Sequence, residues 1–110
     1  MERLSEEKLF NQGKNLSDNE ASALLHKLPE WEILTKNGIQ QLERVYKFKN
    51  FNDALIFTNR VGAIAEEADH HPTLITEWGR CSVTWWTHNL GGLQRNDFIM
   101  AAKTDQLYGY

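Results

Sequence analysis

The sequence contains too few cysteines for a disulfide framework, and it lacks any long apolar run. Cys81 is its single cysteine, so no disulfide can form within the chain, and we expect a reducing cytoplasmic location. No apolar run approaches the roughly 18 residues that a membrane-spanning helix needs. The polar N-terminal residues also lack the apolar core of a signal peptide. We therefore expect a cytoplasmic protein that does not engage membranes.

The sequence also lacks an excess of basic residues. Its 12 Lys and Arg are outnumbered by 15 Asp and Glu, which gives a formal net charge of −3. A non-specific nucleic-acid binder needs a basic patch for the phosphate backbone, so we expect no direct nucleic-acid binding. What the chain does have is a balanced composition, 41% hydrophobic and 25% charged, which is typical of a packed globular core.

The pattern along the chain predicts a single domain over residues 1–110, without repeats or linkers. Residues 1–16 are polar and weakly patterned, and we expect them to form a loosely held N-terminal arm. The rest predicts helices at 17–28, 52–69 and 94–107, and strands at 31–36, 39–48, 74–78 and 81–88. The order α-β-β-α-β-β-α fits an α+β fold, with a four-stranded antiparallel sheet and three helices packed on one face.

Three local signals set the boundaries of these elements. Ser17, with Glu20 three residues later, is a capping box that begins the first helix. Asn37-Gly38 is a strong hairpin signal between the first two strands, because both turn positions need a positive φ. His71-Pro72 should end the second helix, because the residue before a proline is excluded from the α region.

Three of the four histidines, His70, His71 and His88, lie within nineteen residues. Histidine can give or take a proton near neutral pH. Glu66 and His70 are four residues apart on a predicted helix and share a face, so the carboxylate can orient the imidazole. His88 ends a predicted strand and Asp97 lies in the first turn of the last helix. A helix end, a strand end and a helix start could therefore line one cleft.

Each of these features also has an explanation without catalysis. A histidine pair at a helix end is commonly solvated surface, His88 could be half-buried on its strand, and Asp97 could simply favour the helix dipole. The four tryptophans are more typical of a core or an interface than of a ligand platform. A metal site is the main chemical competitor. Adjacent histidines point in different directions and Cys81 has no cysteine partner, so we expect no metal site.

A spaced motif runs through this part of the chain: Glu66-x3-His70-His71-Pro72, then Trp78, His88 and Asp97. Asp69, Thr87 and Gly91-Gly92-Leu93 accompany it. This motif resembles the signature of the pterin-4a-carbinolamine dehydratases, and the resemblance covers roughly residues 17 to 108. It includes the predicted order of elements.

The resemblance implies removal of water from a 4a-hydroxytetrahydropterin, giving the quinonoid dihydropterin in tetrahydrobiopterin recycling. Imidazoles suit this chemistry, because an acid must protonate the leaving hydroxyl while N5–H loses its proton. We assign His70 and His88 as the acid–base pair and His71 to substrate positioning. The expected supporting residues are Glu66, Asp69, Trp78 and Asp97, with Glu66 orienting His70 and Asp97 on the His88 side. No redox change occurs, so no cofactor is needed.

The sequence departs from animal members of this family at two places. Thr73-Leu74 stands where they have Glu-Trp after the proline, and Asn96 stands where they have arginine before the aspartate. Similar proteins are dimers or tetramers, so we expect a homodimer or homotetramer in which helix 52–69 contributes to an interface. The resemblance also implies a functional link to an aromatic amino acid hydroxylase.

Two alternative functions remain open at this point. One is a protein-binding or dimerisation module on the same fold, acting as a transcriptional coactivator or an assembly factor. The other is a pterin-binding protein without turnover. An intact histidine set favours catalysis, because a pure scaffold need not keep it.

Overall fold

A computed structural model of the chain describes residues 3–10 and 13–108. Its helices are α1 (Asp18–Leu25), α2 (Phe51–Ala68) and α3 (Arg95–Leu107), and its strands are β1 (Glu32–Lys36), β2 (Ile39–Lys47), β3 (Thr73–Glu77) and β4 (Arg80–Trp85). Two short 3-10 helices, η1 (Leu4–Glu6) and η2 (His88–Leu90), complete the described elements. The predicted α-β-β-α-β-β-α order and the α+β fold class are confirmed.

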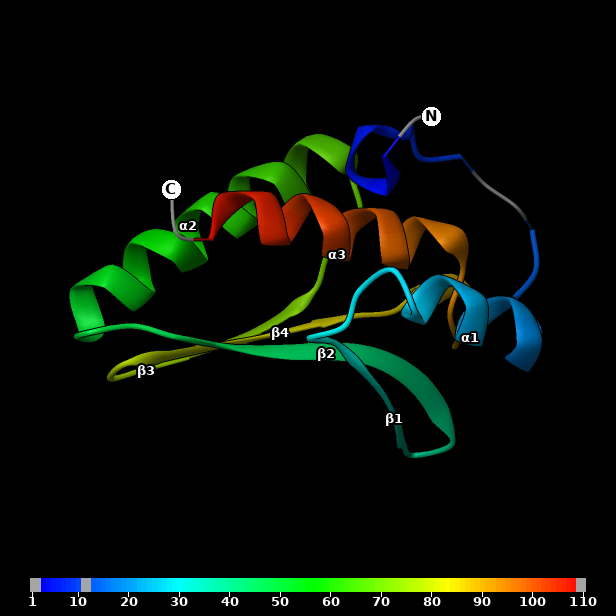
Figure 1. The fold of residues 1–110 in the computed structure, drawn as a ribbon, viewed down its shortest axis with the longest axis horizontal. Coiled ribbons are helices and arrows are strands. Elements are labelled where there is room, and N and C mark those ends of the chain that lie inside the picture. The colour runs from blue at the N-terminus through cyan, green and yellow to red at the C-terminus, as the bar shows by residue number, and fades with distance from the viewer. Residues whose placement is uncertain (1–2, 11–12, 109–110) are drawn as a thin grey trace.

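The four strands form one antiparallel sheet in the order β1-β2-β4-β3. Figure 1 shows α2 and α3 running across one face of this sheet. Alternate residues of β2 and β4 face these helices, as the register pairs Leu42 with Trp85 and Tyr46 with Cys81. All four are buried, together with apolar residues of α2 and α3 that include Phe57, Val61, Phe98, Ile99 and Met100. The core therefore lies between the sheet and the two long helices.

The hairpin between β1 and β2 forms as its turn sequence predicts. Asn37 and Gly38 both have positive φ, at 52° and 77°. The capping box at the start of α1 is also present, with the Ser17 hydroxyl accepting from Glu20 N–H and the Glu20 carboxylate accepting from Ser17 N–H. Local chemistry thus fixes both boundaries, although α1 ends at Leu25, earlier than the predicted helix 17–28.

Helix α2 positions the histidine pair. Asn50 caps its start, accepting a hydrogen bond from Asp53 N–H at 2.7 Å. Ala54, Phe57, Val61 and Ala65 are buried at helical spacing against the sheet. The helix ends at Ala68, and the C-cap residue Asp69 has the left-handed conformation (φ 52°, ψ 42°). This turn redirects the chain immediately before His70.

The last strand is shorter than the predicted strand 81–88. It ends at Trp85, and Thr87 forms an isolated bridge to Gly92 while His88 begins η2. Gly91, at φ 58°, allows the chain to fold back on itself here. His88 therefore lies in a tight loop, whereas the sequence predicts it at the end of a strand.

The N-terminal segment is held by α3 in its described part, residues 3–10. Leu4 is buried, and Lys103 Nζ donates to Ser5 O at 2.7 Å. Arg95 donates two hydrogen bonds to the Glu7 carboxylate, at 2.7 and 2.8 Å. Figure 1 shows the segment running over α3. The sequence predicts a loose arm because the residues that hold this segment lie far away along the chain and leave no local pattern. Residues 1–2 and 11–12 of that arm lie outside the described residues.

A polar cluster joins the other end of α3 to the sheet. Asp105 accepts hydrogen bonds from Trp31 Nε1 (3.0 Å), Arg44 (2.8 Å) and the Tyr46 hydroxyl. Burial of the phenol and the neighbouring Asp105 carboxylate raise the pKa of Tyr46 far above its ordinary value, so it stays a donor. This cluster fixes the position of α3 on the sheet. None of the described helices has the length and apolar character to cross a membrane.

Candidate active site

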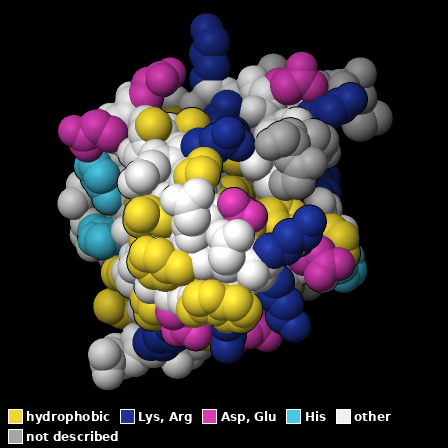
Figure 2. Space-filling model, turned by 90° about the vertical axis from the view of Figure 1, so that its left-hand side faces the viewer, with side chains coloured by type: hydrophobic (Ala, Val, Ile, Leu, Met, Phe, Trp, Pro, Cys, Tyr) yellow, Lys and Arg dark blue, Asp and Glu magenta, His cyan; other side chains and the backbone are white. Residues whose placement is uncertain are grey.

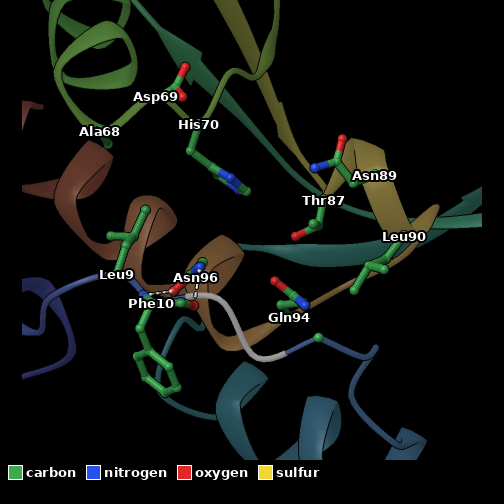
Figure 3. A pocket seen from close by; sticks show the side chains of 11 residues that line it. Leu9, Phe10, Ala68, Asp69, His70, Thr87, Asn89, Leu90, Gln94 and Asn96 are labelled. Carbon is green, nitrogen blue, oxygen red and sulfur yellow. Dashed lines mark hydrogen bonds between the residues drawn. The ribbon is translucent and has the colours of Figure 1, made fainter.

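His70 lies directly after α2 and points into the space between α2, η2 and the start of α3 (Figure 3). Its ring stacks on Trp85 with 5.8 Å between ring centroids and 8° between planes. Trp85 is fully buried and its Nε1–H donates to Thr104 Oγ1 at 3.2 Å. The fixed Trp85 ring therefore holds the imidazole in one orientation. The His70 side chain is 14% exposed.

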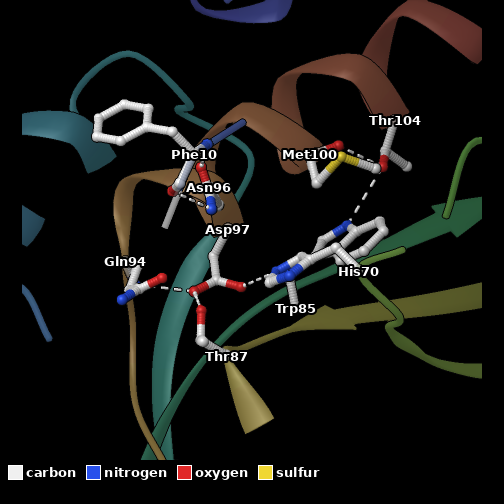
Figure 4. A network of polar contacts seen from close by, with 9 residues as sticks. All are labelled: Phe10, His70, Trp85, Thr87, Gln94, Asn96, Asp97, Met100 and Thr104. Carbon is white, nitrogen blue, oxygen red and sulfur yellow. Dashed lines mark hydrogen bonds and ion pairs between the residues drawn. The ribbon is translucent and has the colours of Figure 1, made fainter. Parts of the chain in front are cut away.

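Asp97 is the acceptor at the centre of the site. Its side chain is fully buried, and Oδ1 lies 2.7 Å from His70 Nε2. Oδ2 accepts from the Thr87 hydroxyl at 2.9 Å and from Gln94 N–H at 2.8 Å (Figure 4). When Nε2–H donates to this carboxylate, Nδ1 is the ring nitrogen left to accept or deliver a proton. Asp97 thus caps α3 and orients His70 at the same time.

Glu66 contacts His71 and not His70, so the predicted pairing of Glu66 with His70 is wrong. Glu66 Oε1 lies 2.8 Å from His71 Nε2, and the two side chains are 83% and 52% exposed. The left-handed turn at Asp69 is the cause, because it breaks the i,i+4 geometry of the helix. The turn brings the residue five positions after Glu66 over its carboxylate.

Asp97, expected to support the His88 side of the cleft, contacts that side through Thr87 and makes no hydrogen bond to His88 itself. The His88 ring instead stacks on Trp86, with 4.2 Å between ring centroids and 9° between planes. Thr87, bridged to Gly92, turns its hydroxyl to Asp97. The neighbouring His88 is thus oriented by an aromatic ring, and Asp97 contacts its neighbour Thr87.

The three histidines line one cavity. Its volume is about 290 Å³ and its lining comprises Asp69, His70, His71, Thr87, His88 and Asn89. Four of these residues, Asp69, His70, Thr87 and Asn89, also line a neighbouring cavity of about 410 Å³. Together the two cavities form what we call the histidine groove. Their volumes lie near the roughly 300–1,000 Å³ of ligand pockets.

The structure does not bring Trp78 to the histidine groove. Its side chain is 71% exposed in the turn between β3 and β4. His88 follows the other end of β4, whose six residues separate the two positions by about 20 Å. The structure thus places Trp78 outside the histidine groove, and its support of the substrate stays a prediction.

Several residues of the groove were missed by sequence reasoning. Gln94 lines the larger cavity and directly precedes α3, where its N–H donates to Asp97; glutamine is not among the residues favoured at a helix N-cap, so no sequence signal marks it. Trp85 lies in the core, as the sequence predicts, and the rings of Trp85 and Trp86 stack on those of His70 and His88. Leu9 and Phe10 also line the groove, and no local signal in the sequence indicates this.

The arrangement suits proton transfer. Within residues 3–10 and 13–108, no group of three or more His, Cys, Asp or Glu side chains is placed to hold a metal ion. The carboxylates near His70 and His71 instead accept from the imidazoles. The fold and the site thus define a small α+β protein whose groove is lined by three oriented histidines.

The comparison with family models identifies the group of proteins. Residues 14–107 match the family described as pterin 4 alpha carbinolamine dehydratase, and this chain belongs to that family. The resemblance noted in the sequence is thereby confirmed.

Solved structures of similar proteins agree with this assignment. A transcriptional coactivator/pterin dehydratase from Brucella melitensis has 31% sequence identity and a TM-score of 0.78, over 87% of this chain and 100% of that one. A pterin dehydratase-like protein identified as a RuBisCO assembly factor in the alpha-carboxysome has 21% identity and a TM-score of 0.62, over 73% of this chain and 90% of that one. The second likeness concerns the fold alone.

Proposed function

We propose that this chain is a 4a-hydroxytetrahydrobiopterin dehydratase, a hydro-lyase that converts the 4a-carbinolamine to quinonoid dihydropterin. The observation that carries the proposal is the buried Asp97–His70 pair, which opens onto a cavity shared with His71 and His88. Membership of the dehydratase family supports the choice of a pterin substrate. The reaction would take place in the cytoplasm and serve tetrahydrobiopterin recycling after an aromatic amino acid hydroxylase.

The proposed chemistry needs one base and one acid. His70 Nδ1 accepts the proton of the substrate N5–H, and the Asp97 carboxylate behind Nε2 stabilises the imidazolium that forms. Protonated His88 delivers a proton to the C4a hydroxyl, which leaves as water while the N5 electron pair completes the C=N bond. Both histidines then exchange protons with solvent. The step involves no redox change, so it needs no cofactor.

The proposed role of His71 is to position the substrate. Its ring lines the same cavity, and Glu66 holds it from the solvent side. Asp69, which directly precedes His70 and also lines this cavity, is the second residue proposed to support the substrate. A flat heterocycle such as a pterin has a polar edge that forms hydrogen bonds and apolar faces that pack against the pocket.

Substitution of the histidines tests this assignment. His70→Ala and His88→Ala should each lower kcat by on the order of 10²-fold, whereas His71→Ala should mainly raise KM. His26→Ala is the matched control, because His26 follows α1 outside the groove. The assay follows formation of the quinonoid product with protein dialysed against a strong chelator. A folded His70/His88 double variant with wild-type turnover would overturn the proposal, and a chelator-sensitive rate restored by zinc would show that the site uses a metal.

We also propose that the chain forms a homodimer or homotetramer. Large apolar side chains are exposed at the start of α2, on β3 and in the turn after it: Phe51, Leu55, Ile56, Ile75 and Trp78. Figure 2, which views this side, shows hydrophobic side chains gathered there. β3 is also an edge strand, and an exposed edge favours pairing across subunits.

The same exposed surface favours a second candidate function, a protein-binding module. The Brucella protein is named a transcriptional coactivator as well as a pterin dehydratase, and the carboxysomal protein is named an assembly factor. A chain that binds dihydropterin without accelerating dehydration would be a pterin-binding protein. A chain that does neither would leave the binding module as the better account.

A further inference from the structure

We propose that the N-terminal segment, residues 3–10, is a wall of the substrate site, and that Asn96 holds it in place. The inference rests on the proposed function, because it assigns the wall to the pterin pocket. It makes Leu9 a substrate-contacting residue and Asn96 a positioning residue. Neither residue belongs to the histidine motif.

Asn96 binds the backbone of Phe10 through both ends of its amide. Phe10 N–H donates to Asn96 Oδ1 at 3.1 Å, and Asn96 Nδ2 donates to Phe10 O at 2.7 Å. Asn96 itself is buried in the first turn of α3, directly before Asp97. Asn96 therefore fixes the N-terminal segment beside the groove, next to Asp97, which orients His70.

Two further contacts attach the segment along α3. The Arg95 guanidinium binds the Glu7 carboxylate through two nitrogens, and Lys103 Nζ binds Ser5 O. Lys103 lies eight residues beyond Arg95, or about 12 Å along the helix. The attachment thus runs from the far part of α3 to the groove, where Asn96 makes the last contact.

Leu9 gives the groove an apolar side. Leu9, Ala68 and Leu90 line the larger cavity together with the polar His70, Thr87 and Gln94. In Figure 3 the Leu9 side chain extends from the N-terminal segment toward Ala68, on the same side as His70. A pterin ring has apolar faces and a polar edge, so this mixed lining suits it. Without the wall the pocket is wider and wetter, and ligand affinity falls.

The chemistry does not depend on this wall. The contacts of His70 with Asp97 and Trp85 come from α3 and β4, and none involves residues 3–10. Loss of the wall should therefore weaken binding and leave the rate at saturating substrate nearly unchanged. This division between KM and kcat distinguishes a substrate wall from a general contribution to folding.

The test measures binding and turnover in the full chain. Leu9→Ala and Asn96→Ala should each raise the Kd for 7,8-dihydrobiopterin and the KM for the carbinolamine by roughly fivefold or more, with kcat within about twofold of wild type. Lys103→Met is the matched control, because it removes only the attachment at Ser5 and leaves the contact between Asn96 and Phe10 in place, so its Kd should stay near wild type. Bound dihydrobiopterin should also slow tryptic cleavage after Lys8 in the wild type, and less so in Asn96→Ala.

The outcomes separate the two proposals. If the wild type binds dihydrobiopterin and both variants bind it equally well, the wall is overturned and the dehydratase proposal stands. If the wild type neither binds dihydrobiopterin nor dehydrates the carbinolamine, both proposals fail. Should Asn96→Ala prove unfolded by circular dichroism, Leu9→Ala decides alone, because Leu9 lies outside α3.

Discussion

At the scale of single residues, Asp97 combines a structural role and a chemical one. Its two oxygens accept from Thr87, Gln94 and His70 in a fully buried position. Such a carboxylate is expensive to bury unless every lone pair it turns to the protein is matched by a donor. The same matching orients the imidazole, so stability and geometry at His70 depend on one group.

Asp97→Asn tests this dependence. The amide supplies one acceptor oxygen and one NH2 group, so the NH2 faces either the donors of Thr87 and Gln94 or His70 Nε2, which must then be the acceptor of the other tautomer. We expect kcat to fall by on the order of 10²-fold, because the His70 tautomer is no longer fixed. We also expect the free energy of unfolding to fall by about 1–3 kcal/mol, because a buried donor loses its partner. Steady-state kinetics and urea unfolding measure the two effects.

Glu66→Gln is the matched control for that substitution. The Glu66–His71 distance of 2.8 Å is close to the 2.7 Å of the Asp97–His70 pair, but Glu66 and His71 are exposed to solvent. Loss of the Glu66–His71 pair should therefore change the free energy of unfolding by well under 1 kcal/mol. A Glu66→Gln variant that lost as much turnover as Asp97→Asn would contradict the roles assigned to the two carboxylates.

At the scale of elements, the contact between the N-terminal segment and α3 depends on an ion pair. Hydrogen bonds from Arg95 hold the pKa of Glu7 below its usual range, despite the opposing effect of partial burial. The folded-state pKa thus lies below the unfolded one. The pair's stabilisation is fully present above the ordinary glutamate pKa of about 4.3 and is lost as the pH falls through the lowered folded pKa.

Glu7→Gln should therefore reduce stability by an amount that depends on pH. We expect the difference in unfolding free energy between wild type and variant to be constant from about pH 8 to 5 and to shrink below about pH 4. Urea unfolding at a series of pH values measures it. Glu6→Gln, which alters an exposed carboxylate of η1, is the control and should show little difference at any pH. A Glu7→Gln effect that persists unchanged at pH 3 would contradict the ion-pair account.

At the scale of the whole molecule, the exposed apolar residues of α2 and β3 are the main unpartnered surface in the described part of the chain. Monomeric proteins rarely leave large apolar patches in water, because each Å² costs about 25 cal/mol. Association of two or four copies would remove this cost.

The oligomer is tested by substitution on α2. The wild type should be a dimer or tetramer at micromolar concentration in sedimentation velocity. Ile56→Glu places a charge in the expected interface and should shift the protein toward the monomer. Ser22→Glu, at an exposed position of α1 away from this surface, shows whether added charge alone has this effect. A wild-type protein that sediments as a stable monomer would rule out the proposed assembly.

The sequence alone determined the features that depend on neighbouring residues. The Asn37-Gly38 turn, the Ser17 capping box and the end of α2 before Pro72 all follow from backbone preferences within a few positions. The strand and helix order followed from hydrophobic periodicity, because one face of each element must be buried. The clustering of His70, His71 and His88 also followed, since these residues come shortly after the ends of α2 and β4.

The tertiary structure decided which side chains meet. Because Asp69 has a left-handed backbone conformation, Glu66 contacts His71. His70 contacts Asp97, which lies 27 positions further along the sequence. The length of β4 kept Trp78 away from the groove, and the hydrogen bonds of Asn96 on α3 brought Phe10 into it. Such contacts depend on how several elements are placed relative to one another, and the conformation of one residue between two elements can change that placement. The local sequence pattern does not contain this information.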